Sequence, residues 1–293
     1  MVIKKTKSEL GFDVFNTALM ILFCLIMLYP LLYVVSHSFM TDADRVMRPL
    51  ALIPHEWTIE GYAFIFSGNS ILLNSFGITM FRTIIGTVLS LILESMFAYV
   101  ISKKKYPMKN ALTMMVALTM WFDGGLIPKF LLIKSLGFMN SIWVYVIPTA
   151  MSVWNILILR NFFAQIPDSI EESARIDGAN EAVVLFKLII PLSTAVLATV
   201  ALFHVVGHWN EWFTATLYVN DKFKQPAMVI LRNVLTKVSV ADMQLEGSGS
   251  SYTPPSFAVQ MATIVVVAFP ILVAYPFFQK YFTKGMMMGS IKG

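Results

Sequence analysis

The chain has 293 residues, of which 57% are hydrophobic and 13% are charged, with a formal net charge of +5. An ordinary soluble domain carries about 25% charged residues, so this composition excludes a domain that faces water on all sides and favours one solvated by lipid. The basic residues form no Lys/Arg-rich stripe interleaved with aromatics, which excludes a nucleic-acid partner as well. Cys24 lies in an apolar run, where we expect a buried small hydrophobe.

Six segments approach the roughly 20 apolar residues that a helix needs to cross a bilayer. They are residues 14–36, 75–102, 111–132, 141–163, 189–213 and 257–282. The first exceeds the ~7–15 residues of a signal-peptide core and precedes no small-residue cleavage site, so we expect it to stay as a span. The third is interrupted by Asp123, two glycines and Pro128. The sequence therefore predicts an all-α integral membrane protein with six transmembrane helices, in a single domain over residues 1–293.

Basic residues give the expected orientation. Lys103, Lys104 and Lys105 directly follow the second predicted span, and basic residues mark cytoplasmic loops. This bias favours both termini in the cytoplasm. Residues 215–256 then form a long external loop, in which the apolar stretch 228–240 is expected to be a short helix.

The segment 166–191 is the most informative part of the chain. Asp168 can cap a helix, with Glu171 three residues later as in a capping-box variant. Gly178 permits the positive φ that ends one helix and turns into the next. We expect a short amphipathic helix, a sharp turn and a second helix that leads to Pro191. On physical grounds alone, an interfacial loop helix explains the segment equally well.

A resemblance to a known family decides between these readings. The pattern Glu172-Ser173-Ala174, Gly178 and Leu188-x-Ile190-Pro191 resembles the EAA loop of ABC-importer permeases. The wider chain is similar to the permeases of carbohydrate importers, the class of the smaller permease of the maltose system. Three stretches and the C-terminal tail carry this similarity: Gly125-Leu126-Ile127-Pro128, Ala174-Arg175-Ile176-Asp177-Gly178-Ala179, Trp209-Asn210-Glu211-Trp212 and Gln279-Lys280-Tyr281-Phe282. The long external loop suggests the branch that handles large oligosaccharides, with the permease of an alginate importer as one candidate.

The resemblance implies a type I permease fold that forms half of a transmembrane pathway in the bacterial cytoplasmic (inner) membrane. Residues 166–191 would be the coupling loop, whose helix sits in a cleft of the ATPase. Its coupling residues would be Glu171, Glu172, Ser173, Ala174, Asp177 and Gly178, with Glu172 paired to a basic residue of the ATPase. The implied partners are a second permease in a heterodimer, two copies of an ATPase and an extracytoplasmic binding protein.

The same resemblance makes this chain a transport subunit rather than an enzyme. It would hold no cofactor of its own, since ATP and Mg are bound by the partner ATPase. In agreement, the sequence contains no phosphate-binding G-x-x-x-x-G-K-[ST] pattern.

Polar side chains inside the predicted spans are candidates for the pathway, because such groups are costly in lipid and face protein or a water-filled cavity. The candidates are Arg82, Asn155, His204, His208, Asn210 and Glu211. The alternative for each is interhelical hydrogen bonding, which we favour for Glu94. A positive charge at Arg82 would suit an anionic sugar. His204 and His208 have the i, i+4 spacing of a metal pair, but no third ligand accompanies them, so no metal site is expected.

Three other functions remain as alternatives. A secondary transporter usually carries internal repeats and paired ionisable groups near the midplane, and neither is visible here. A membrane-embedded enzyme would need a pattern such as His-Glu-x-x-His or Gly-x-Ser-x-Gly, which is absent. An ABC permease for a non-sugar solute is disfavoured by the carbohydrate-type stretches but is not excluded by them.

Overall fold

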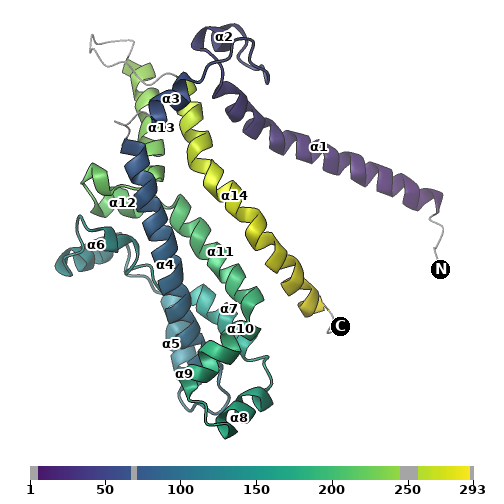
Figure 1. Cartoon of the computed structure of the whole chain (residues 1–293), viewed down its shortest axis with the longest axis vertical. Coiled ribbons are helices and arrows are strands. Elements are labelled where there is room, and N and C mark those ends of the chain that lie inside the picture. Colours follow the sequence, from purple (N-terminus) through teal and green to yellow (C-terminus); the bar gives the residue numbers. More distant parts are fainter. Residues whose placement is uncertain (1–5, 67–70, 245–256, 291–293) are drawn as a thin grey trace. The chain divides into compact units, whose positions relative to one another are not determined.

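The computed structural model of the 293-residue chain describes residues 6–66, 71–244 and 257–290. These residues form helices and turns, with an isolated bridge between Met40 and Trp57 and no strand among them. The chain divides into two compact units, Met1–Ser70 with Asn233–Ala268, and Ile71–Arg232 with Phe269–Gly293. Figure 1 labels the helices of both units. The predicted all-α fold is confirmed for the described part of the chain.

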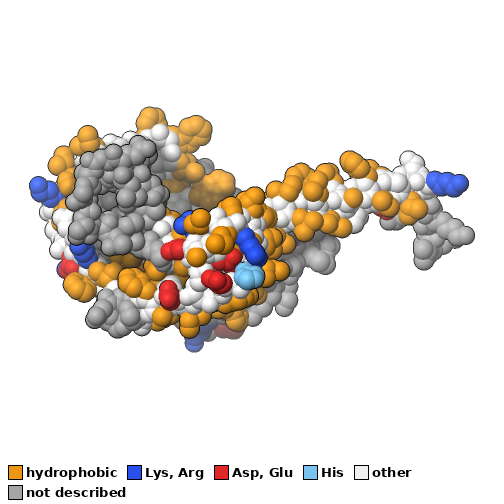
Figure 2. Space-filling view, turned by 90° about the horizontal axis from the view of Figure 1, so that it is seen from above, with side chains coloured by type: hydrophobic (Ala, Val, Ile, Leu, Met, Phe, Trp, Pro, Cys, Tyr) orange, Lys and Arg blue, Asp and Glu red, His pale blue; other side chains and the backbone are white. Residues whose placement is uncertain are grey.

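The first unit begins with α1 (Lys7–His37), which starts at a capping box formed by Thr6 and Glu9. Hydrophobic side chains are exposed along nearly its whole length, as the orange surface of Figure 2 shows. Such a helix needs lipid or another chain as its solvent. Cys24 is exposed on α1, so the expectation of a buried cysteine was wrong, because α1 buries only Ser36 and His37.

The rest of the first unit contains α2 (Asp42–Met47), α3 (Glu60–Phe66) and the first part of α14 (Phe257–Ser290). The Asp44 carboxylate accepts the backbone N–H groups of His55 and Glu56 at 2.7 and 3.2 Å. These hydrogen bonds hold the loop after α2 back against that helix.

The second unit is built on α4 (Ile71–Ser102), which packs against α7 (Val153–Phe163) and α11 (Thr194–Asn210). Their facing sides bury apolar residues such as Ala98, Leu159 and Val200. The contact of α4 with both helices places its interior polar residues between them. This packing positions the candidate site.

Among the described residues, three helices are long and apolar enough to cross a membrane: α1, α4 and the Phe257–Phe277 part of α14. They correspond to the first, second and sixth predicted spans. The third predicted span is bent by 113° between α5 (Lys109–Trp121) and α6 (Leu126–Ser135), where Asp123 and the glycines lie. The fifth is bent by 86° at Ser193, which lies between Leu192 and Thr194. The structure thus offers three spans, or five if each bent pair counts as one, and six stays a prediction.

The fourth predicted span is not one continuous helix. Residues 141–163 form a 3-10 helix, η1 (Ile142–Tyr145), an irregular stretch and the 11-residue helix α7. Pro148 lies in the irregular stretch, where its ring cannot continue a helix, and the Ser152 side chain caps α7. The chain is therefore broken in the middle of the expected span.

The predicted external loop contains more helix than expected. It holds most of α12 (Phe213–Tyr218), the 3-10 helix η3 (Lys222–Lys224) and α13 (Ala227–Gln244). The helix predicted over 228–240 is confirmed as part of α13. The Gly/Ser run at 247–251 lies outside the described residues.

Candidate functional site

A hollow of about 480 Å³ opens between α4, α7 and α11 in the second unit. It is lined by Arg82, Thr149, Ser152, Trp154, Asn155, Phe203, His204, Gly207, His208 and Glu211. Five of the six residues predicted for the pathway are in this lining. The sixth, Asn210, is exposed at the last residue of α11 and is not part of it. The structure thus brings together polar residues that lie up to 129 positions apart in the chain.

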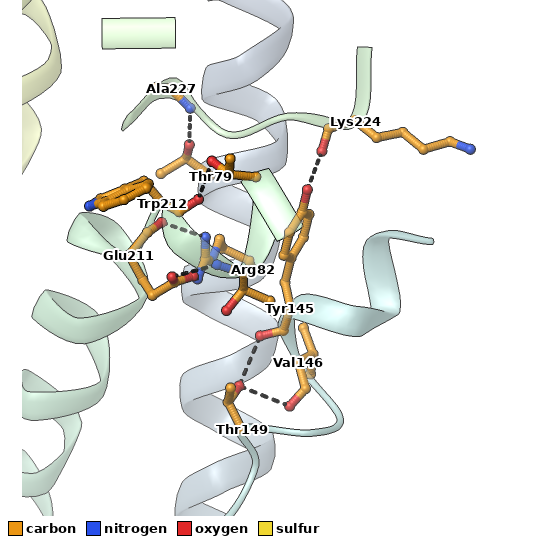
Figure 3. A network of polar contacts seen from close by, with 11 residues as sticks. Thr79, Arg82, Tyr145, Val146, Thr149, Glu211, Trp212, Lys224 and Ala227 are labelled. Carbon is orange, nitrogen blue, oxygen red and sulfur yellow. Dashed lines mark hydrogen bonds and ion pairs between the residues drawn. The ribbon is translucent and has the colours of Figure 1, made fainter. Parts of the chain in front are cut away.

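Arg82 lies at one side of the hollow with only 1% of its side chain exposed. One guanidinium nitrogen donates to the Glu211 carboxylate and the other to the Glu211 backbone carbonyl, both at 2.9 Å. The guanidinium also lies 5.0 Å from the centre of the Tyr145 ring (Figure 3). The positive charge expected at Arg82 is therefore balanced here by Glu211, whose side chain is 31% exposed.

Hydrogen bonds next to Arg82 pair the free backbone groups at helix ends with side chains, as Figure 3 shows. Thr79 on α4 accepts the N–H of Ala227 at 2.9 Å, and the Tyr145 hydroxyl donates to the Lys224 carbonyl at 2.8 Å. Thr149 donates back to the Tyr145 carbonyl at 2.9 Å. The backbone groups at helix ends have no partner within their own helix, so they need such partners when they lie among apolar spans.

Glu94, which is fully buried, joins three elements of the second unit. One carboxylate oxygen accepts the backbone N–H of Ser152 at 2.7 Å, at the break before α7. The other lies 2.9 Å from Nε2 of His204 on α11, which is also 3.0 Å from the Asn155 side-chain amide. The expected interhelical hydrogen bonding of Glu94 is therefore present, and Glu94 also provides an acceptor for the Ser152 N–H at the break before α7.

The His208 ring lies against α4 at Gly86, which has no side chain. A Cβ at Gly86 would lie 2.5 Å from Nε2 of His208, so only glycine leaves room for the ring. His208 stacks on His204 with ring centroids 6.0 Å apart. Within the described part of the chain, no group of three His, Cys, Asp or Glu side chains is placed to hold a metal ion.

The segment 166–191 forms the predicted succession of helix, turn and second helix. It contains α8 (Asp168–Ile176), α9 (Glu181–Val183), the π-helix η2 (Val184–Ile189) and α10 (Ile190–Leu192). Gly178 has φ +87°, as expected for the turn, and the Asn180 side chain caps α9. Figure 1 shows α8 and α9 near the C-terminal end of α4.

The cap predicted at Asp168 was wrong. Pro167 occupies the N-cap position without a side-chain hydrogen bond, and Asp168 is the first residue of α8. Its carboxylate instead accepts from Lys104 at 2.9 Å, and this contact lowers the pKa of Asp168. The Asp168 carboxylate thus pairs with a lysine that follows α4 instead of capping α8.

The lysines after α4 form a network with α8 that sequence reasoning missed. Lys103 forms an ion pair with Glu171, and its ammonium lies 3.7 Å above the centre of the Tyr99 ring. Burial lowers the pKa of Lys103, and the contact with Glu171 opposes this shift. The sequence contained one signal, since three consecutive lysines face three acidic residues in the first turns of α8.

The remaining predicted coupling residues lie mostly on the surface of the segment. Glu172, Ser173, Asp177 and Gly178 are exposed, whereas Ala174 is half-buried against the apolar core of the second unit. Ile176 was not among the predicted residues, yet 86% of its side chain is exposed. Together they make a polar surface with one prominent apolar residue.

Apolar helices, a polar hollow between them and a helix–turn–helix segment with an exposed face define the class of a transporter's membrane subunit. The chain belongs to the family described as the binding-protein-dependent transport system inner membrane component, whose model matches residues 108–288. It is therefore a permease subunit of an ABC transporter, a transport subunit rather than a catalytic one.

Relatives and a solved structure agree with this assignment. The chain is 41% identical over 282 residues to the polygalacturonan/rhamnogalacturonan transport system permease protein YtcP of Bacillus subtilis, covering 96% of this chain and 98% of the relative. It is 39% identical to protein LplC of the same organism, covering 98% and 97%. A chain from a crystal structure of a bacterial ABC transporter that imports the acidic polysaccharide alginate matches with a TM-score of 0.85 and 32% identity, covering 95% of this chain and 99% of that one.

Proposed function

We propose that this chain forms half of the pathway by which an ABC importer moves an acidic oligosaccharide into the cytoplasm. The observation that carries the proposal is the hollow between α4, α7 and α11, where a buried arginine lies beside amide, imidazole and carboxylate groups. The relative named for polygalacturonan and the structure of an alginate importer both concern polymers of acidic sugars. A permease for a non-sugar solute is the alternative within the family.

In this proposal the Arg82–Glu211 pair is the resting state of the sugar site. A uronate carboxylate would take the place of the Glu211 carboxylate on one guanidinium nitrogen, while the Glu211 backbone carbonyl keeps the other. Asn155 and His204, in the same hollow, would then serve the sugar hydroxyls. The Glu211 carboxylate is partly exposed, and its second oxygen accepts the Thr214 N–H at 2.8 Å, so it would keep a partner when it leaves Arg82.

Arg82→Gln tests this role directly. The amide keeps hydrogen-bonding capacity but not the charge, so uptake of uronate oligomers should fall while uptake of a neutral oligosaccharide of equal length should not. The measurement is substrate-limited uptake into vesicles. If uptake of uronate oligomers stays unchanged, Arg82 does not recognise the sugar charge.

The architecture proposed around the hollow has six spans and both termini in the cytoplasm. The long apolar surface of α1 supports contact with lipid or with the second permease. Two ATPase subunits, which bind ATP and Mg, and an external binding protein complete the importer. Pairing with a different permease, rather than with a second copy, follows the pattern of the carbohydrate importers.

Residues 166–191 are proposed to be the coupling loop that sits on the ATPase. The exposed face with Glu172, Ser173, Ile176 and Asp177 supports this role, because it leaves one apolar and several polar groups without cover. Movement of the ATPase pair would carry α8 with it. The positive φ of Gly178 keeps the following turn tight.

The test is ATPase activity of the complex reconstituted in lipid, with and without a binding protein loaded with an acidic oligosaccharide. Stimulation by the loaded binding protein should be lost in Gly178→Pro and in Glu172→Lys. Stimulation that survives in both variants would place the coupling loop elsewhere. Uptake that continues without ATP would support the secondary transporter instead.

A further inference from the structure

Two physical routes lead from the segment 166–191 to the helices that line the hollow. The first follows the chain from α9 through the π-helix η2 and α10, then through a bend of 86° into α11. A π-helix and a sharp bend interrupt the regular hydrogen-bond ladder, so this route is poorly suited to transmit a displacement. The second route passes through space to the C-terminal end of α4.

The second route touches the segment on both sides of the Gly178 turn. Lys103 pairs with Glu171 on α8, before the turn. The Tyr99 hydroxyl donates to Glu181 on α9, after the turn, at 2.8 Å. Lys103 and Tyr99 also contact each other, since the ammonium lies 3.7 Å from the ring centre. The end of α4 therefore holds both arms of the segment.

Arg175 joins the two carboxylates to one another. Its guanidinium lies 2.8 Å from the Glu181 carboxylate and 3.6 Å from that of Glu171. The two acidic residues that α4 holds are thus also linked within the segment. A displacement of α8 reaches α4 through one connected set of contacts.

Among the lysine contacts, that of Lys103 is the best shielded from water. Lys103 and Glu171 have 21% and 16% of their side chains exposed. The Lys104–Asp168 and Lys105–Glu172 pairs are far more exposed, and the latter spans 3.9 Å. Exposed pairs are screened and contribute little, so Lys103 dominates the connection.

We propose that Lys103 and Tyr99 are positioning residues that make the segment 166–191 move as one body with α4. The inference rests on the proposed function, because it concerns how movement of the ATPase reaches the hollow. It assigns that transmission to α4 rather than to the chain connection into α11. Glu94 and Arg82 lie on α4 about 14 and 32 Å from Lys103 along a straight helix, so tilting α4 moves both.

The experiment uses the full transporter in lipid with its loaded binding protein, and measures ATP hydrolysis and uptake in the same vesicles. In Lys103→Met, stimulated hydrolysis should persist while uptake per ATP falls by about tenfold, a loss in the range typical of coupling between two sites. Tyr99→Phe, which removes the hydroxyl and its bond to Glu181 but keeps the ring below Lys103, should lower the ratio less. Lys105→Met, at a side chain that is 95% exposed, is the matched control and should keep the wild-type ratio.

The charge exchange Lys103→Glu with Glu171→Lys separates positioning from a simple loss of fold. It should raise uptake per ATP part of the way from the Lys103→Met value towards the wild-type value, because the ion pair returns with its signs reversed although position 171 then carries a positive charge beside Arg175. A wild-type ratio in Lys103→Met, or no recovery in the exchange variant, would overturn the inference while leaving the proposed function intact. Absent stimulation in the unmodified complex would instead contradict the proposed function itself.

Discussion

Two polar networks lie on the same helix, α4, and they differ in how completely protein surrounds them. Arg82 and Glu94 are almost fully buried, and each bonds to backbone groups as well as to side chains. Lys103 and the Tyr99 hydroxyl, at the end of α4, bond to the carboxylates of Glu171 and Glu181, which remain partly open to solvent. The inner network therefore completes broken backbone and is part of the packing. The outer one is a set of side-chain contacts that can be changed without unfolding the helices.

If the inner network is part of the packing, the largest loss of stability is expected for Glu94→Ala. The substitution leaves the Ser152 N–H without its acceptor and opens a cavity between helices, so the free energy of unfolding should fall by about 3 kcal/mol. Titration of the purified protein with a denaturing detergent, followed by tryptophan fluorescence, measures this loss.

Glu94→Gln is the matched control for that substitution. Its carbonyl can still accept from Ser152 and its amide can donate to His204, so it should lose less than about 1 kcal/mol. Equal losses in the alanine and glutamine variants would show that the charge of Glu94, rather than its hydrogen bonds, supports the inner network.

A middle-sized effect is expected for Gly86→Ala, which tests how tightly the inner network is packed. Inside a helix, replacing glycine with alanine normally stabilises the protein by about 0.5–1 kcal/mol. Here the new Cβ would lie 2.5 Å from Nε2 of His208, and such overpacking costs about 1–3 kcal/mol. Because this cost exceeds the gain in helix propensity, the free energy of unfolding should fall. The measurement is the same detergent titration.

Gly77 supplies the control on the same helix, because a Cβ there meets nothing within 4 Å. Gly77→Ala should leave stability unchanged or raise it. Adding His208→Ala to Gly86→Ala should recover most of the loss. Destabilisation that persists in this double variant would mean that the imidazole is not what excludes a side chain at position 86.

The smallest effect on stability is expected at the exposed Lys104–Asp168 pair, which lies next to the outer network. The Lys104 contact holds the pKa of Asp168 below its ordinary value of 3.8. Because the folded-state pKa is the lower one, this pair contributes above pH 3.8 and its contribution is lost as the pH falls through the folded-state pKa. Lys104→Ala should raise the pKa of Asp168, as read from carboxyl ¹³C shifts of protein with labelled aspartate. Lys105→Ala should raise it less, and the reverse order would contradict the assigned pairing.

Local chemistry predicted the parts of the molecule that depend on neighbours in the chain. The Gly178 turn was predictable because a positive φ and short flanking helices are local properties. The long helices α1, α4 and α14 followed from continuous apolar runs. The five residues that line the hollow were identified because polar groups inside apolar runs are costly in lipid and therefore face protein or water. Their partners could not be predicted.

What the sequence did not reveal depends on residues far apart in the chain. Glu211 as the partner of Arg82 arises only when α4 and α11 pack together, and the pairing of Lys103 with Glu171 spans 68 positions. The break before α7 was missed because residues 141–163 are apolar enough for a span. Hydropathy alone does not register Pro148 or the acceptor that Glu94 provides at Ser152.

The gap that Gly86 leaves for His208 restricts how α4 and α11 can rearrange. Sliding one helix along the other by one turn, about 5.4 Å, would bring Arg82 or Ser90 opposite the imidazole in place of the glycine. Each carries a Cβ that the ring has no room for. Axial sliding is therefore blocked in both directions, and the two helices can change their relation only by tilting or by separating. Any opening between α4 and α11 therefore requires the imidazole to leave the gap at Gly86 sideways, as the two helices tilt or separate.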